Sequence, residues 1–185
     1  VMEEYGNQIL LSSARNRYMG KRIEKLLRRS LWAIREELKD SDFEPAGFEI
    51  SFDSQSFLDS MCLQLSETGR MYLRGKIDRM DLYRDSGQVL VRIVDYKSGN
   101  TSFSLEDFYY GLQLQLILYM KAALEIEKGH HPDKKTSPAA MLYYQMQDPL
   151  IEAGEDDPAE DLRLKTLRMN GLVSSDEKVY CHLDN

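Results

Sequence analysis

The first forty residues show the spacing of a helix with one apolar side. Between Ser12 and Lys39, with no glycine or proline after Gly20, apolar residues recur every three or four positions: Ile23, Leu26, Leu27, Leu31, Ile34 and Leu38. This spacing predicts one long amphipathic helix. Pro45 and Gly47 are expected to break it, because neither residue suits a helix interior.

Shorter apolar runs separated by turn residues follow the helix. Strands are predicted at Phe48 to Phe52, Met61 to Leu65, about 71–84, 88–97 and Ala139 to Met146. Ser104, with Asp107 three residues later, resembles a helix start, and an apolar helix is predicted from Gly111 to Glu127. Polar loops are predicted at Ser98 to Ser104 and Gly129 to Pro138, an acidic linker at Pro149 to Pro158, and a short helix from Ala159 to Met169 that stops at Asn170-Gly171.

The predicted order of elements is helix, three or four strands, helix, strand. This order is typical of the α/β class, with a mixed β-sheet core flanked by helices. The length of 185 residues suits one domain, made of a long basic helix (1–40), a core (45–146) and an acidic linker with a C-terminal helix (147–185). Because the chain begins with Val1 inside a region that has the pattern of regular structure, we expect it to be a fragment of a much larger chain.

The strands at 71–84 and 88–97 are predicted to form a hairpin. The turn residues Asp85-Ser86-Gly87-Gln88 separate them and allow a two-residue loop. In that register the facing residues match in character: Met80 with Ile93, Leu82 with Val91, Asp81 with Arg92 and Tyr83 with Leu90. A slip by one residue would mix polar and apolar side chains on one face, so we prefer this register, in which Asp78 faces Asp95.

Two facing carboxylates on an otherwise apolar face need compensation, because like charges on opposed strand residues destabilise a sheet. Mg²⁺ or Mn²⁺ would provide it, since hard cations bind carboxylate oxygens and keep positions open for water and phosphate. Lys97 lies two residues past Asp95 and therefore on the same face, where its ammonium can act on a water or a phosphate. The alternative is that Asp78 and Asp95 are separate surface carboxylates, each paired with a nearby basic residue.

Four further residues are candidates for the surroundings of this site. Gln115 and Tyr119 are four apart in a predicted helix and share one face, where they would contact DNA or a metal-bound water; satisfaction by backbone groups or solvent is the alternative. Gln113 lies on a different face and is a weaker candidate. Glu49 would add a carboxylate from the preceding strand, unless it faces solvent.

The charge of the chain is unevenly distributed. The net charge is −7, yet the predicted first helix carries three acidic residues and nine basic ones: Arg15, Arg17, Lys21, Arg22, Lys25, Arg28, Arg29, Arg35 and Lys39. The segment from Glu152 to Asp161 is strongly acidic. The overall charge argues against a protein that coats DNA, while the basic helix would either contact phosphates locally or form a solvated face.

Several classes of protein are disfavoured by what the chain lacks. No run of about 18 apolar residues indicates a membrane span and no signal peptide is evident, so a cytoplasmic location without membrane contact is the expectation. Cys62 and Cys181 are too few and too far apart for a disulfide framework. No glycine-rich phosphate loop is present, which argues against an ATPase within the chain.

Together these residues resemble the PD-(D/E)XK nuclease superfamily and, within it, the RecB-like branch. The resemblance rests on Gly75-Lys76-Ile77-Asp78-Arg79, Val94-Asp95-Tyr96-Lys97-Ser98-Gly99 and the Gln115, Tyr119 pair. Three further runs are similar to the C-terminal nuclease domain of the B subunit of AddAB-type ATP-dependent helicase/deoxyribonucleases: Phe43 to Phe52, Tyr110 to Leu116 and Arg168 to Val173. The resemblance covers nearly the whole chain.

The resemblance implies a restriction-endonuclease-like core and Mg²⁺-dependent cleavage of single-stranded DNA from an unwound duplex, beside a helicase-nuclease partner subunit. The role implied is the processing of double-strand breaks for recombination. Carried over by motif, Asp78 and Asp95 bind the metal, the backbone carbonyl of Tyr96 adds a ligand, and Lys97 is the catalytic lysine. Gln115 and Tyr119 line the site.

The chain departs from the family pattern at two points. The family places a histidine ligand on a helix ahead of this region, and no histidine occurs before His130, so we expect that helix upstream of Val1. The family domain often carries a four-cysteine 4Fe-4S cluster, which Cys62 and Cys181 do not match in spacing; a cluster is therefore expected only in the full-length protein. Both departures argue against full activity of the chain alone.

Two other functions remain open from the sequence. A nuclease-like fold that grips DNA or a partner without cutting is the first, although such a module would not need opposed carboxylates beside a lysine. A stand-alone RecB-like nuclease is the second.

Overall fold

The computed structural model describes residues 13–52, 62–64, 66, 69–99, 103–149 and 159–183. The predicted acidic linker lies outside these residues except for Pro149, as do both ends of the predicted strand Met61 to Leu65. The contacts divide the chain into two compact units, Val1–Glu36 with Met146–Arg168, and Glu37–Gln145 with Met169–Asn185. None of the helices in the described ranges is long and apolar enough to cross a membrane.

The first unit contains most of the long helix α2 (Ala14–Lys39) and the short helix α5 (Ala159–Thr166). The predicted helix is confirmed, and Asp148 forms ion pairs with its basic side, at 3.3 Å from Lys25 Nζ and with Arg29. Three residues of its apolar stripe, Ile23, Leu27 and Leu31, are exposed and the other three are half-buried. The buried residues of α2 are Gly20, Ser30 and Ala33. The periodicity of the stripe therefore predicted the helix but not its burial.

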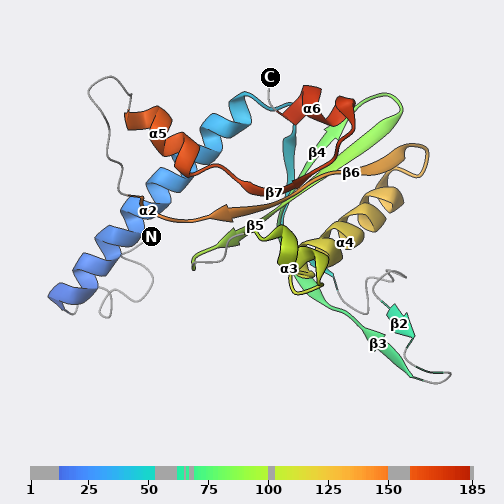
Figure 1. Ribbon diagram of the computed structural model, residues 1–185, viewed down its shortest axis with the longest axis horizontal. Coiled ribbons are helices and arrows are strands. Elements are labelled where there is room, and N and C mark those ends of the chain that lie inside the picture. Colours follow the sequence, from blue (N-terminus) through green and yellow to red (C-terminus); the bar gives the residue numbers. More distant parts are fainter. Residues whose placement is uncertain are drawn as a thin grey trace. The chain divides into compact units, whose positions relative to one another are not determined.

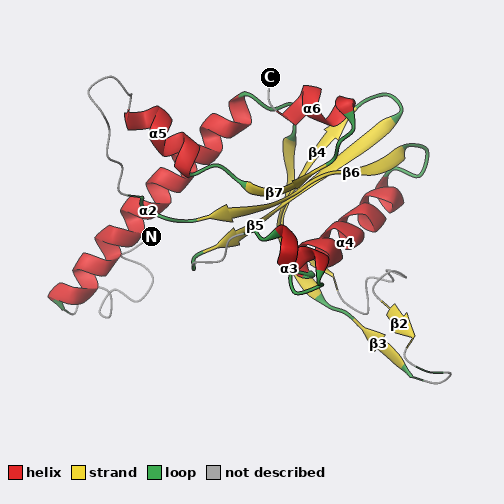
Figure 2. Ribbon diagram, viewed as in Figure 1, coloured by secondary structure: helices red, strands yellow, loops and turns green. Residues whose placement is uncertain are grey.

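The second unit is built on a five-stranded mixed sheet, which confirms the predicted α/β class. The strand order is β1 (Glu44–Phe52), β4 (Gly75–Arg84), β5 (Gln88–Lys97), β6 (Lys135–Gln145) and β7 (Asn170–Val173). Neighbouring strands are antiparallel except for β5 and β6, which are parallel. A separate two-stranded ribbon contains β2 (Cys62–Gln64) and β3 (Arg70–Tyr72), and is drawn in yellow with the other strands in Figure 2.

The crossover from β5 to β6 carries two helices, α3 (Leu105–Tyr109) and α4 (Gln115–His130). Figure 1 shows α4 running beside β6. Leu116, Met120 and Ala123 of α4 are buried against one face of the sheet, together with Met80 and Ile93 among others. The opposite face has a smaller apolar cluster that includes Phe43, Leu90 and Val179, the last from helix α6 (Glu177–Leu183).

Five predictions about local structure are corrected by the structure, and three of them concern strands and loops. The predicted loop Gly129 to Pro138 is wrong at both ends, because α4 continues to His130 and β6 begins at Lys135, where pairing with β5 outweighs the polar sequence. The strand predicted from Phe48 to Phe52 begins earlier, at Glu44, and so includes Pro45 and Gly47. A proline is tolerated there because β1 is an edge strand, and its register with β4 shifts between these two residues. The predicted strand at 71–84 is divided into β3 and β4.

The remaining corrections concern helices. Ser104 caps α3 as predicted, its hydroxyl accepting from Asp107 N at 3.1 Å. The helix predicted to begin at Gly111 begins only at Gln115, after a turn in which Gly111 has a φ of +74°. The Asn170-Gly171 stop is instead the start of β7. Short elements such as β7 and α6 have too little periodicity to be recognised from sequence.

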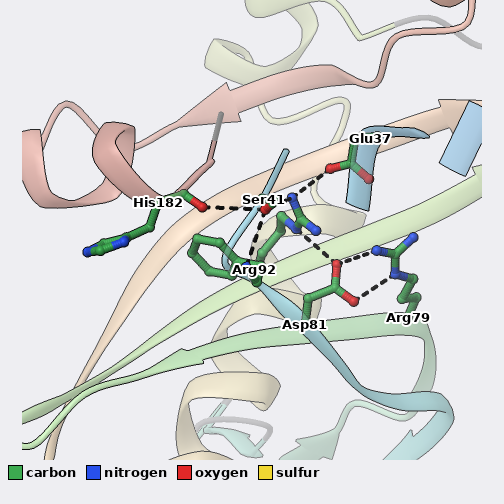
Figure 3. Close-up of polar contacts among 7 residues, drawn as sticks. Glu37, Ser41, Arg79, Asp81, Arg92 and His182 are labelled. Atoms are coloured by element: carbon green, nitrogen blue, oxygen red, sulfur yellow. Dashed lines mark hydrogen bonds and ion pairs between the residues drawn. The ribbon is translucent and has the colours of Figure 1, made fainter. Parts of the chain in front are cut away.

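A buried group of charged side chains anchors the second unit on the face away from α4 (Figure 3). Asp81 faces Arg92 across β4 and β5, and accepts hydrogen bonds from Arg79 Nε and Nη2 at 2.7 Å each and from Arg92 Nε at 2.9 Å. Asp81, Arg79 and Arg92 are each at most 1% exposed. We call these three residues, with Glu37, the Asp81 network.

The Asp81 network ties the end of α2 to the sheet. Arg92 Nη1 donates to Glu37 Oε1 at 2.7 Å, and the guanidinium lies 5.0 Å over the Phe43 ring. Burial raises the pKa of Glu37, and the attraction of Arg92 opposes this shift. Ser41, which follows α2, donates to the backbone carbonyl of His182 at 3.4 Å, so α6 is connected to the same region (Figure 3).

Replacing Asp81 should be strongly destabilising. The variant Asp81→Ala leaves two buried guanidiniums without their shared carboxylate, and we expect the free energy of unfolding to fall by about 3–5 kcal/mol. Urea denaturation followed by circular dichroism measures this change. The control is Glu24→Ala, which breaks the exposed Glu24–Arg28 pair of 2.9 Å and should cost about 0.5 kcal/mol or less. Equal losses in the two variants would contradict the anchoring role.

Candidate active site

The predicted carboxylates meet where the pairing of β4 and β5 ends. Four of the five predicted facing pairs of the hairpin are observed, but the ladder ends with Arg79 and Val94, so the predicted pair of Asp78 with Asp95 is not part of it. Asp78 and Asp95 are the next residues along each strand. There, the backbone amide of Tyr96 donates to Asp78 Oδ2 at 2.9 Å. Beyond the last backbone pair, this hydrogen bond to its side chain holds Asp78 beside β5.

Asp95 lies in a largely desolvated position. It is 2% exposed; its Oδ2 is 2.6 Å from Lys97 Nζ, and its Oδ1 accepts from Gln115 Nε2 at 2.8 Å. Burial raises the pKa of the Asp95 carboxyl, Lys97 opposes the shift, and the negative charge of Asp78 adds to it. Removal from water is therefore the main reason that the charged form of Asp95 is disfavoured, and the second carboxylate adds to the effect.

Gln115 connects the charged groups through both ends of its amide. Lys97 Nζ donates to Gln115 Oε1 at 2.9 Å, while Gln115 Nε2 donates to Asp95 and, at 3.0 Å, to the hydroxyl of Tyr119. A lysine can only donate and a carboxylate can only accept, so these partners fix the orientation of the amide. Gln115 and Tyr119, the pair predicted to share one helix face, therefore lie beside Asp95 and Lys97.

The ring of Tyr119 packs closely against the ring of Phe52 and the backbone of Gly75. Its ring packs edge-on to Phe52 with centroids 5.9 Å apart. A Cβ on Gly75 would lie 2.7 Å from Phe52 Cζ and 3.1 Å from Tyr119 Cε1, closer than normal contact. Gly75 therefore leaves the space that the two rings occupy. A glycine inside a strand was the available signal for such an approach, although the sequence could not name the partner.

The other predicted residues lie in different surroundings. Glu49 is exposed, has a positive φ of 54°, and forms an ion pair with Lys76. Gln113 accepts from the backbone amide of Ser104 at 3.2 Å, and so contacts the start of α3. Tyr96 is joined to Asp78 by its amide, and the ligand role of its carbonyl stays a prediction.

The donor set has the chemistry of a site for a hard divalent cation. Asp78 and Asp95 offer carboxylate oxygens, which Mg²⁺ binds while keeping several waters. Within the described ranges, no cluster of three or more His, Cys, Asp or Glu side chains suited to a metal is found. Mg²⁺ or Mn²⁺ would fit this pair of carboxylates, because either ion would keep coordination positions open for water and a phosphate. The positive charge of the ion would also reduce the repulsion between Asp78 and Asp95.

Substitution of Gly75 should disturb the site through Tyr119. In Gly75→Ala the new methyl group must displace the Phe52 or Tyr119 ring, and we expect a loss of about 1–3 kcal/mol in unfolding free energy. A crystal structure of the variant should show Tyr119 moved from Gln115. The control is Gly129→Ala in α4, where a Cβ meets nothing within 4 Å and helix propensity favours alanine. An unmoved Tyr119 would refute the packing argument.

The raised pKa of Asp95 predicts a pH trend in metal-free buffer. A raised carboxyl pKa contributes stability that is complete below the unfolded pKa of about 3.9 and is lost as pH rises through the folded value. The melting temperature of Asp95→Asn relative to the unsubstituted protein should therefore rise between about pH 4 and 7. Differential scanning fluorimetry with EDTA measures it.

Asp85→Asn provides the control of opposite sign for this trend. Backbone hydrogen bonds from Gly87 and Gln88 lower the pKa of Asp85, so its contribution is lost as pH falls. Parallel pH profiles of the two variants would contradict the assigned environments.

Comparison with known proteins identifies the family of the chain. The profile of the family described as "PD-(D/E)XK nuclease superfamily" matches residues 1–179. The B subunits of ATP-dependent helicase/deoxyribonucleases are similar over 99% of the chain, with 38% identity in Clostridium acetobutylicum and 40% in Lachnoclostridium phytofermentans. The chain covers 16% and 15% of the lengths of these relatives. From the family match over residues 1–179 and the similarity to these relatives, the chain belongs to the PD-(D/E)XK nuclease superfamily.

Proposed function

We propose that this chain is the core of a Mg²⁺-dependent deoxyribonuclease domain. It hydrolyses DNA phosphodiesters within a cytoplasmic helicase-nuclease complex that processes double-strand breaks for recombination. The observation that carries this proposal is Lys97 held between Asp95 and Gln115 beside a second carboxylate, Asp78. The names of the similar proteins, B subunits of ATP-dependent helicase/deoxyribonucleases, support the larger complex. In that complex a partner subunit and single-stranded DNA from the unwound duplex would bind this domain.

The chemistry follows from the placement of three side chains. Asp78 and Asp95 would hold Mg²⁺, which supplies a Lewis acid and lowers the pKa of bound water. Lys97 places a positive charge where negative charge grows on the phosphoryl oxygens, and a donor aimed at such oxygens is typically worth about 10²–10³ in rate. Its ammonium would also be able to orient a water beside the phosphate.

Gln115 and Tyr119 act on the geometry of those groups. The amide of Gln115 contacts both Asp95 and Lys97, so it fixes their separation and limits the rotation of the lysine. Tyr119 fixes Gln115 by accepting its second amide hydrogen, and Phe52 holds the Tyr119 ring. Such preorganisation keeps reacting groups close to productive positions.

Cleavage by substituted proteins tests the proposal. In the complete subunit with its helicase partner, Asp78→Ala and Lys97→Ala should each lower Mg²⁺-dependent cleavage of end-labelled single-stranded DNA by about 10²-fold or more. The control is Lys134→Ala; this lysine donates to Asp85 O at the hairpin turn, at the other end of the strands, and its loss should leave cleavage unchanged.

The outcomes separate three functions. Cleavage that persists in Asp78→Ala or Lys97→Ala would show that the site is assigned wrongly. An unsubstituted protein that binds the strand without cutting it would instead support the module that only grips DNA. Full cleavage without any partner or helicase region would favour a stand-alone nuclease.

A further inference from the structure

An aromatic ring lies against the ammonium of Lys97. The Nζ atom is 5.2 Å from the centroid of the Tyr143 ring, within the range of a cation–π contact. Tyr143 is 5% exposed and belongs to the apolar cluster beneath α4. Its ring is therefore fixed by packing while it meets the lysine.

The parallel pairing of β5 and β6 places this ring. Asp95 is paired with Tyr143, and Lys97 with Gln145, so Tyr143 lies on the strand next to the catalytic groups. The following residue, Tyr144, points to the other face and packs edge-on to Tyr96 with centroids 5.9 Å apart. A shift of one residue between the strands would exchange the two tyrosines.

Two of the three contacts of Lys97 depend on the carboxylate of Asp95, and the contact with Tyr143 does not. Asp95 is a metal-ligand candidate, and Gln115 is hydrogen-bonded to that same carboxylate. Both contacts must adjust when Asp95 shares its oxygens with a cation. Tyr143 alone among these three partners offers no oxygen to the lysine, because its π face makes the contact. This contact does not compete with a metal.

We propose that Tyr143 is a positioning residue for Lys97, whose ring holds the ammonium in place when Asp95 is engaged elsewhere. The proposal rests on the proposed nuclease function for its kinetic consequences, and on the geometry alone for the ring contact. A lysine side chain has a flexible four-carbon stem, so a fixed ring at its end restricts where the ammonium can lie. The ring acts through Lys97 and is not itself a reacting group.

Kinetics of two substitutions separate the ring from its hydroxyl. In the complete subunit with its partner, Tyr143→Phe keeps the ring and should retain kcat within about twofold, because the π face is preserved. Tyr143→Leu removes the ring and should lower kcat about tenfold with little change in KM, as expected for a contact worth about one power of ten in rate. Rates are measured on labelled single-stranded DNA with saturating Mg²⁺.

Tyr144→Leu is the matched control. Tyr144 is 1% exposed, so this change also removes a buried ring from β6, but on the face away from Lys97. We expect a comparable loss of thermal stability and an unchanged kcat at a temperature where all variants are folded. A loss of kcat in this control equal to that in Tyr143→Leu would reduce Tyr143 to a packing residue and overturn the proposal.

A second measurement needs no catalysis. Lysine amines of the metal-free subunit are dimethylated with ¹³C-labelled methyl groups, which keeps their charge, and Lys97→Arg identifies the signal of Lys97. Methyl groups over an aromatic ring resonate upfield of those on free lysine. The upfield signal should persist in Tyr143→Phe and Tyr144→Leu and return to the free position in Tyr143→Leu.

The two measurements fail in different ways. Absence of an upfield signal, or equal loss of kcat in Tyr143→Phe and Tyr143→Leu, would overturn the role of the ring. An unsubstituted protein that does not cleave DNA but shows the upfield signal would refute the proposed function while supporting the ring contact.

Discussion

The shared carboxylate of Asp81 between two buried guanidiniums is the interaction on which the site depends. A buried ion pair is not in itself proof of high stability, because desolvation offsets much of the attraction. Its stronger effect here is on register. Any slip between β4 and β5 would separate Asp81 from Arg92 and leave buried charges unpaired. Since the same two strands carry Asp78 and Asp95, the carboxylates of the proposed metal site, the network on one face determines which residues become neighbours on the other.

The two faces are also linked through a single residue. The amide of Tyr96 donates to Asp78 on the side of the proposed metal site, and its side chain interacts with Arg79 of the Asp81 network. Arg79 in turn binds Asp81, which binds Arg92 and through it Glu37 at the end of α2. The strand end that holds Asp78 therefore cannot move independently of the buried charges. Rigid support of this kind is what a preorganised catalytic site needs.

Local patterns were sufficient to predict part of this arrangement. The hairpin register followed from a two-residue turn and matched facing residues, and the meeting of Gln115 with Tyr119 followed from helical spacing. What escaped prediction depends on pairing between distant segments. The polar start of β6 is a strand because β5 lies beside it, and Tyr143 reaches Lys97 only through that parallel register. The approach of Gly75 to Phe52 and Tyr119 likewise joins three separate elements.

The parallel pair of β5 and β6 also has a consequence for how the protein matures. The hairpin of β4 and β5 closes through neighbouring residues, whereas β6 can join only after the chain has passed through α3 and α4. Such non-local pairings form slowly compared with local ones. A newly made chain should thus bring its two carboxylates together before Gln115 and Tyr143 come to lie against Lys97. If the proposed function holds, the capacity to cut DNA would then appear only after β6 has joined the sheet.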